Sequence, residues 1–306
     1  MKLPEIKFLT PVYLRGLLMG TADLIPGVSG GTMALITGIY ERLLSALSSL
    51  NLNAWRMLLR GRINQFWKYI DGNFLLSLFA GILTAVFLLS RLIYFLLENY
   101  PLEVWAFFFG LIAASAVYII RQTPWRKPST WFFVLAGALA AWLITGMLPE
   151  QGPRTSPYLF LSGAAASVAM ILPGISGSYI LVLMGSYAYV LESVRNFRLM
   201  NLMIFTLGVV TGLLGFSALL KWFFSRYRHY TLALMGGFLL GSLRQVWPWK
   251  KVLMTRIIEG KEIIVKARPV LPWHYEGDPH YASALLLMAA GMGLVMVFEK
   301  IQKRYG

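Results

Sequence analysis

The sequence contains one pattern twice, IPGVSGGTMALITGIYERLL at residues 25–44 and LPGISGSYILVLMGSYAYVL at residues 172–191. The copies align with an offset of 147 (172 minus 25), and the identical positions in the first copy are Pro26, Gly27, Ser29, Gly30, Gly38, Tyr40 and Leu44. Each copy sets a helix-breaking Pro-Gly pair within apolar sequence. In a membrane such a break is tolerated where it lines a cavity, and its unpaired N–H groups and hydroxyls can then hold a ligand.

The composition excludes a soluble protein of ordinary type, because 58% of the 306 residues are hydrophobic and only 13% are charged. Several uncharged runs approach the roughly 20 residues that cross a bilayer as helix. The first apolar stretch carries Arg15 and Asp23 and lacks a small-residue cleavage site, so we expect it to remain in the protein. The chain has no cysteine and three histidines, all at segment ends or in loops, so we expect no metal, no cofactor and no histidine catalysis within the membrane.

The formal net charge of +15 is concentrated in segments that flank the apolar runs. The positive-inside rule then predicts cytoplasmic N- and C-termini, with anionic lipids as partners and no nucleic acid. The segment 248–280 would lie outside despite its basic residues, which weakens this assignment. The oligomeric state is left open.

A second set of repeated residues follows with an offset of 127 (208 minus 81), from Gly81 and Gly208 to Ser115 and Ser242. The uncharged run 155–191 has 37 residues, about 55 Å as straight helix against a membrane core of roughly 30 Å. A re-entrant helical hairpin, broken at Pro-Gly, accommodates this length. Each half then crosses the membrane an odd number of times, which makes the two halves inverted repeats of the kind found in secondary transporters.

The predicted fold is therefore an all-α polytopic membrane protein of two inverted repeats, each with a re-entrant hairpin and about three further spans. The first repeat covers 1–150, with a hairpin at 11–45, an amphipathic insertion at 52–71, and spans at 73–97, 102–120 and 129–148. The second covers 151–306, with a hairpin at 157–192, spans at 199–224 and 230–247, an extramembrane loop at 248–280, and a span at 281–299. The insertion interleaves aromatic and leucine residues with arginines, which is typical of a helix in the membrane interface, although an ordinary basic loop is an equal alternative.

The repeated motifs predict an anion site. A helix that begins after each Pro-Gly turn presents free N–H groups and a partial positive charge, which suit a phosphate or carboxylate. Close packing of helices through small residues is the alternative. The predicted binding residues are Pro26, Gly27, Ser29, Gly30, Gly31, Thr32, Pro173, Gly174, Ser176, Gly177 and Ser178.

Four charged residues extend this prediction. Asp23 is a carboxylate within the apolar stretch and is a candidate for a coupling proton or sodium ion, for an ion pair with Arg15 or Arg42, or for a helix cap. Arg15, Arg91 and Arg244 could bond a phosphate, although the default for Arg91 and Arg244 is to extend toward the interface.

Four segments resemble the DUF368 family of bacterial membrane proteins: RGLLMGTADLIPGVSGGTMALITGIYERLL (15–44), FFFGLI (107–112), AMILPGISGSYILVLMGSY (169–187) and GSLRQVWPW (241–249). The resemblance covers nearly the whole chain. It implies a polyprenyl-phosphate transporter of the bacterial inner membrane that returns the undecaprenyl phosphate carrier lipid to the cytoplasmic leaflet for peptidoglycan and other envelope polymers. The residues alone predict only an anion-binding transporter with inverted repeats, and a carrier of small anions remains an alternative.

A second alternative is an enzyme. Undecaprenyl-pyrophosphate phosphatases of the BacA type carry a motif of the form PGxSRSxxT, which is similar to Pro26–Thr32. Gly30 and Gly177 stand where that motif has its arginine, and no glutamate pair lies near. The charge stabilisation needed for phosphoryl transfer is therefore missing, so we expect a site that holds a phosphate without cleaving it.

Overall fold

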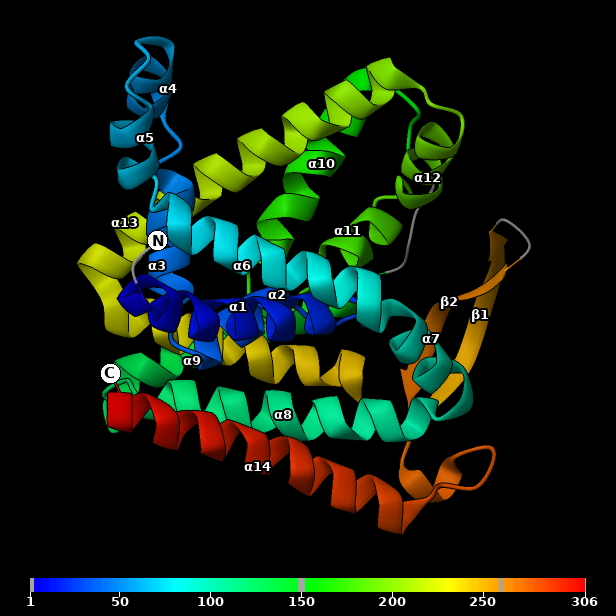
Figure 1. The fold of residues 1–306 in the computed structure, drawn as a ribbon. Helices are drawn as coiled ribbons and strands as arrows, with labels where there is room; N and C mark the ends of the chain where they lie inside the picture. The colour runs from blue at the N-terminus through cyan, green and yellow to red at the C-terminus, as the bar shows by residue number, and fades with distance from the viewer. Residues whose placement is uncertain (1–2, 148–151, 259–260, 306) are drawn as a thin grey trace.

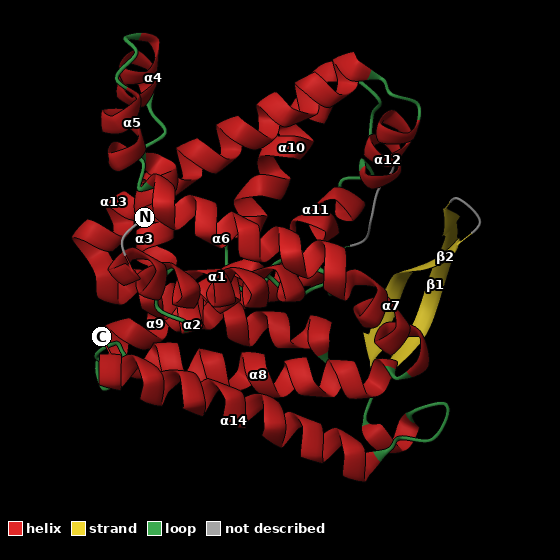
Figure 2. Cartoon of the chain, in the orientation of Figure 1, coloured by secondary structure: helices red, strands yellow, loops and turns green. Residues whose placement is uncertain are grey.

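The computed structural model describes residues 3–147, 152–258 and 261–305, and helices make up most of this part of the chain (Figure 2). The first half contains α1 (Leu3–Asp23), α2 (Gly30–Ile36), α3 (Tyr40–Ser48), α4 (Leu52–Leu59), α5 (Ile63–Tyr69), α6 (Gly72–Thr84), the π-helical segment η1 (Ala85–Leu89), α7 (Ser90–Asn99), α8 (Pro101–Arg121) and α9 (Pro128–Gly146). The second half contains α10 (Ser156–Ile171), α11 (Gly177–Leu183), α12 (Tyr187–Arg195), α13 (Leu199–Val246), β1 (Lys250–Ile258), β2 (Lys261–Pro269), the short 3-10 helix η2 (Pro272–His274) and α14 (Tyr281–Tyr305).

Five helical segments of the described chain are long and apolar enough to cross a membrane, so the protein is a multi-pass membrane protein. These segments are Gly72–Asn99, Pro101–Arg121, Pro128–Gly146, Leu199–Val246 and Tyr281–Lys300. α13 has 48 residues but is interrupted at Tyr227, where φ is −135° and ψ is 43°. The interruption divides α13 into two arms, which cover the spans expected at 199–224 and 230–247. α11 and α12 form a shorter apolar pair with a bend of 106° between them.

The backbone changes direction at the same positions in both halves. Gly27 and Gly174 have φ of 82° and 86°, and Gly38 and Gly185 have φ of 77° and 64°, a region that glycine enters without steric cost. Tyr100, between α7 and α8, has φ of −135° and ψ of 48°, nearly the values of Tyr227 at the offset of 127 (227 minus 100). Helices α2 and α3 begin at 30 and 40, and α11 and α12 begin 147 residues later at 177 and 187.

Helices of the two halves also pack on each other. α8 lies against α14, and α9 lies against the second arm of α13 (Figure 1). Glycines allow the close approach, since an added β-carbon at Gly110 would lie 2.1 Å from Met288 O and one at Gly237 would lie 2.1 Å from Val134 O. The largest buried cluster joins both halves and includes Ile25, Leu111 and Met235.

One expectation, that of an all-α fold, is wrong. The expected loop at 248–280 contains the antiparallel strands β1 and β2, in which Lys250 pairs with Pro269 and Ile258 with Lys261. The fold is therefore not all-α. Both strands are rich in β-branched residues, which favour extended backbone. The insertion 52–71 forms two short helices, α4 and α5, because Gly61 has a φ of 69° and turns the chain between them.

Candidate functional site

The two Pro-Gly breaks lie in direct contact at the centre of the molecule. α1 ends at Asp23 and α2 begins at Gly30, while α10 ends at Ile171 and α11 begins at Gly177. Ser29 Oγ lies 3.2 Å from both Met170 O and Leu172 O, where it can donate its single proton. In return, Gly174 N donates to Thr32 Oγ1 at 3.0 Å. The structure thus brings the two repeated motifs together, although 147 residues separate them in sequence.

The polar groups of the first motif are hydrogen-bonded within the protein. Asp23 Oδ1 accepts from Gly30 N at 2.7 Å, and Ser29 Oγ accepts from Gly31 N at 3.1 Å. All residues of α2 are buried. Gly31 packs so closely on the end of α10 that an added β-carbon would lie 2.6 Å from Ile171 O. The polar groups of this motif are therefore engaged in holding the two breaks together.

The second motif is more open. Of α11, Gly177 and Leu181 are buried, whereas Ser178 is exposed. Ser176 makes no side-chain cap, and its Oγ lies 2.9 Å from Ser178 Oγ. Two differences between the copies explain this openness, since Met170 stands at the position of Asp23 and Ser178 at the position of Gly31. No carboxylate at position 170 can therefore occupy the N–H groups at the start of α11.

The charged residues that were predicted for the site lie in three places. Arg244 stacks on Trp142, with Cζ 5.3 Å from the ring centroid, and interacts electrostatically with Tyr179 of α11. Arg15, on α1, lies near Arg42. Arg91 is exposed on α7, which packs against η1 and α8. Among the described contacts of these three arginines, that of Arg244 is the one with the helix of the second break.

Of the roles open to Asp23, an ion pair with Arg15 or Arg42 is not among the described ion pairs, and Arg42 pairs with Asp71. Arg42 Nε lies 2.6 Å from Asp71 Oδ2, and its Nη2 lies 3.0 Å from Oδ1. Asp23 instead caps the start of α2, which is the role that its position next to a helix break allowed. Asp23 has accessible surface beside the break, although protein surrounds much of its carboxylate.

The sequence analysis missed two residues of α13 that lie against both breaks. An added β-carbon at Gly174 would lie 2.6 Å from Ser242 Oγ, and one at Gly27 would lie 2.9 Å from the Gln245 side chain. Gln245 Oε1 is buried and has no hydrogen-bond partner among the described residues. The sequence gives one indication of their importance, because Ser242 in GSLRQVWPW repeats Ser115. The repeat does not indicate which side of the helix faces the motifs.

Lys250, the first residue of β1, lies next to the C-terminal end of α13 and outside the apolar spans. Its Nζ donates to the Gln245 backbone carbonyl and lies 3.7 Å from the ring centroid of Trp105, on α8. Burial lowers the pKa of Lys250 to about 7. The face of Trp105 favours the charged form and acts in the opposite direction.

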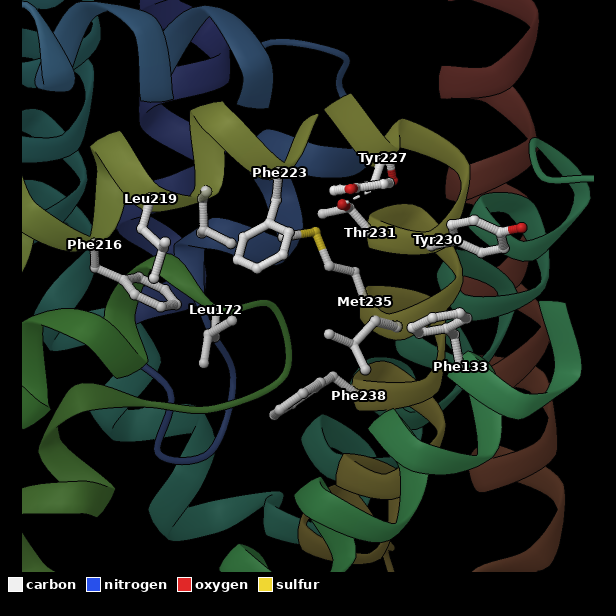
Figure 3. A pocket seen from close by; sticks show the side chains of 12 residues that line it. Phe133, Leu172, Phe216, Leu219, Phe223, Tyr227, Tyr230, Thr231, Met235 and Phe238 are labelled. Atoms are coloured by element: carbon white, nitrogen blue, oxygen red, sulfur yellow. Dashed lines mark hydrogen bonds between the residues drawn. The ribbon is translucent and has the colours of Figure 1, made fainter. Parts of the chain in front are cut away.

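An apolar cavity of about 510 Å³ adjoins the second motif (Figure 3). Twelve side chains line it, most of them from the two arms of α13, and six of the twelve are aromatic. Leu172, the residue before Pro173, lies at its wall and connects the cavity to the break. A polar motif and an apolar cavity thus lie side by side.

This arrangement suits a ligand with an anionic head and a hydrocarbon tail. Hydroxyls and Arg244 can bond an anion near α11, and the cavity can hold apolar groups. Within the described residues, no group of three or more His, Asp or Glu side chains could hold a metal ion.

Comparisons with known proteins agree with this chemistry. The model of the VCA0040-like family, described as undecaprenyl phosphate translocase-like, matches residues 19–263. A Vibrio cholerae protein named polyprenyl-phosphate transporter is 43% identical over 300 residues, which cover 95% of this chain and 96% of the relative. A Staphylococcus aureus protein of the same name is 32% identical over 255 residues, which cover 77% of this chain and 85% of the relative. No solved structure matches the chain.

Proposed function

The chain belongs to the undecaprenyl phosphate translocase-like family, and we propose that it moves a polyprenyl phosphate between the leaflets of a bacterial inner membrane. The observation that carries this proposal is the contact of two polar helix breaks beside an apolar cavity that begins at Leu172. The relatives are named transporters, and this chain acts as a transporter rather than an enzyme.

We infer that residues 1–150 and 151–306 are inverted repeats whose breaks enter the membrane as re-entrant hairpins. The matching glycine φ values and the 106° bend between α11 and α12 support this arrangement. In Figure 1, α3 and α12 lie at opposite ends of the bundle. The start of α1 and the end of α14 share a side with the α4–α5 insertion, which agrees with cytoplasmic termini and a membrane-interface role for that insertion.

The two motifs would together surround the phosphate, but they differ in the hydrogen-bond donors that they can offer it. In this conformation Ser29, Gly30, Gly31 and Thr32 bond within the protein, so the second motif supplies the available donors. Ser176, Gly177 and Ser178 contribute hydroxyl and N–H groups, while Pro173 and Gly174 shape the break. Arg244 adds a charge-assisted bond, while Arg15 and Arg91 make no contact with the second motif among the described interactions.

Asp23 is our candidate for the coupling group. Its carboxylate occupies Gly30 N, a donor that a phosphate oxygen could otherwise use. Protonation, or binding of a sodium ion, would weaken that bond and remove a charge that repels the phosphate. Binding of the lipid would then be linked to binding of a cation at Asp23.

The proposal can be tested in vesicles that contain the purified protein and undecaprenyl phosphate. Leaflet-resolved detection of the lipid should reveal movement with the native chain and a loss of about 10-fold or more with Ser176→Ala and Ser178→Ala together, as expected for lost hydrogen bonds to a charged group. Ser225→Ala is the matched control, because this exposed serine bonds only to Trp222 O in its own helix.

Three outcomes would favour another function. Release of phosphate from undecaprenyl pyrophosphate by the purified protein would indicate the phosphatase. Uptake of inorganic phosphate without lipid movement would indicate a carrier of small anions. Unchanged lipid movement in the double serine variant, at normal protein levels, would contradict the assignment of the second motif.

A further inference from the structure

The cavity inside the bend of α13 indicates which part of the lipid it holds. It lies between the two arms of α13, with Leu172 of the second break at its wall and Phe133 of α9 nearby (Figure 3). Its volume of about 510 Å³ falls within the roughly 300–1,000 Å³ typical of small-molecule sites.

The cavity is open to the side. Leu219 and Tyr227 are 47% and 45% exposed, although both line the cavity. In a membrane protein such a surface faces lipid hydrocarbon. An occupant can therefore enter laterally from the bilayer without crossing water.

The lining offers little to a polar ligand. The Thr231 hydroxyl is already bonded to Tyr227 O at 3.0 Å, and Figure 3 shows the Tyr230 hydroxyl pointing away from the other lining side chains. Tyr227 also has a phenol hydroxyl, and the other lining residues are leucine, phenylalanine or methionine. This mostly apolar lining favours a hydrocarbon occupant.

We propose that this cavity binds the isoprenoid units that adjoin the phosphate of the transported lipid, an inference that rests on the function proposed above. The position of Leu172 carries the argument, because a phosphate held at Ser176 and Ser178 must place its first carbons close to the break. In a polyprenyl phosphate, a single branched chain is attached directly to the phosphate. In a glycerophospholipid, a glycerol and two acyl chains must fit next to it. A single apolar cavity of about 510 Å³ beside the phosphate site suits the single chain, and its aromatic walls would contact the methyl branches and double bonds.

The bend at Tyr227 has a role in this proposal. Without the interruption α13 would continue straight, and its two arms could not enclose a cavity. The repeat-related interruption at Tyr100 separates α7 from α8. The same local backbone geometry thus produces a lipid cavity in the second half of the chain.

A cavity-filling variant with a matched control tests the proposal. Leu219→Trp fills the cavity, whereas Leu207→Trp makes the same change on the same arm at a position that is 59% exposed and does not line it. Binding of undecaprenyl phosphate, geranyl phosphate and a dipalmitoyl phosphatidic acid to the purified full chain is measured by native mass spectrometry.

We expect Leu219→Trp to weaken undecaprenyl phosphate binding about 10-fold, since excluding two CH₂ groups already costs roughly that factor. Geranyl phosphate, whose two isoprenoid units adjoin its phosphate, should be weakened by Leu219→Trp as well, whereas Leu207→Trp should behave like the native chain. Equal undecaprenyl phosphate affinities for the two tryptophan variants would overturn the cavity assignment alone. A native chain that binds phosphatidic acid as tightly as undecaprenyl phosphate would also overturn it. Failure of the native chain to bind either prenyl phosphate would instead overturn the proposed function.

A second measurement does not depend on how the variants fold. A photoreactive leucine analogue at position 219 or 207 keeps the size of the native side chain. Illumination in bacterial membranes should attach a polyprenyl phosphate at 219 and acyl lipids at 207. Acyl lipids alone at both positions would refute the proposal.

Discussion

Ser29 and Ser176 stand at the same place in the two motifs, yet we predict that replacing each with alanine has different consequences for stability. Both residues precede a seven-residue helix, with φ and ψ of −120° and 132° at Ser29 and −92° and 136° at Ser176. The backbone is therefore similar at the two positions. The hydroxyls differ, because Ser29 Oγ accepts from Gly31 N and approaches two carbonyls of the other break, whereas Ser176 Oγ contacts Ser178 Oγ.

The magnitude follows from these contacts. Loss of a serine cap costs about 0.5–2 kcal/mol, and loss of the one proton shared between Met170 O and Leu172 O adds about 1 kcal/mol. Because Ser29 is only 1% exposed, water cannot replace these bonds. We therefore expect Ser29→Ala to lower the free energy of unfolding by about 1.5–3 kcal/mol. Ser176→Ala should lower it by less than about 1 kcal/mol, since its partner Ser178 is exposed and can bond to water.

The assay is reversible denaturation of the purified variants in detergent micelles, followed by the intrinsic fluorescence of tryptophan. Equal losses for the two variants would refute the reasoning, because they would mean that the bonds between the breaks contribute nothing beyond a cap. Binding of undecaprenyl phosphate supplies the complementary measurement, and here we expect Ser176→Ala to cause the larger defect in the folded fraction.

Three further predictions follow from single contacts. Gly31→Ala places a β-carbon 2.6 Å from Ile171 O and should lower the free energy of unfolding by about 1–3 kcal/mol. The repeat-related control Ser178→Ala should change the free energy of unfolding by less than about 0.5 kcal/mol. Similar values for the two variants would contradict the difference in packing. Asp23→Asn should make lipid movement in vesicles independent of imposed proton and sodium gradients, and native movement that already ignores both gradients would exclude a coupling role. Between about pH 7 and pH 10 the unfolded chain holds the Lys250 proton that the folded chain has lost, so the free energy of unfolding should rise with pH by at most about 1.4 kcal/mol per pH unit. Lys250→Met should remove this rise. An identical pH dependence in both proteins would show that burial does not lower the pKa of Lys250.

The membrane helices could be anticipated from hydropathy because a long uncharged run has few other solutions in a bilayer. The helix breaks could be anticipated because Pro-Gly cannot continue a helix, and Gly27 and Gly174 indeed adopt positive φ. The pairing of β1 with β2 does not follow from the sequence pattern, because the charges of residues 248–280 predict a loop. Strand formation there depends on a partner segment in the same hairpin, which charge counting does not reveal.

The contacts of the site were less predictable than its location. Repetition of Pro-Gly-x-Ser-Gly indicated where the breaks lie, but the contacts of Ser242 and Gln245 with them depend on the rotation of α13 about its axis. That rotation is set by packing of the second arm of α13 against α8 and α9. Residue spacing within one helix carries no information on it.

Identical motif residues do not give the two copies identical chemistry. The positions that match, such as Ser29 and Ser176, have similar backbone conformations. The positions that differ determine which hydrogen-bond donors are available to a ligand. Asp23 supplies an internal anion to the first copy, and Met170 cannot do the same for the second. Gly31 lets the first copy pack against α10, whereas Ser178 faces open space. The duplicated sequence thus provides one structural contact and one accessible polar surface, which is the surface we propose for the phosphate, and the substitutions between the copies distinguish the two.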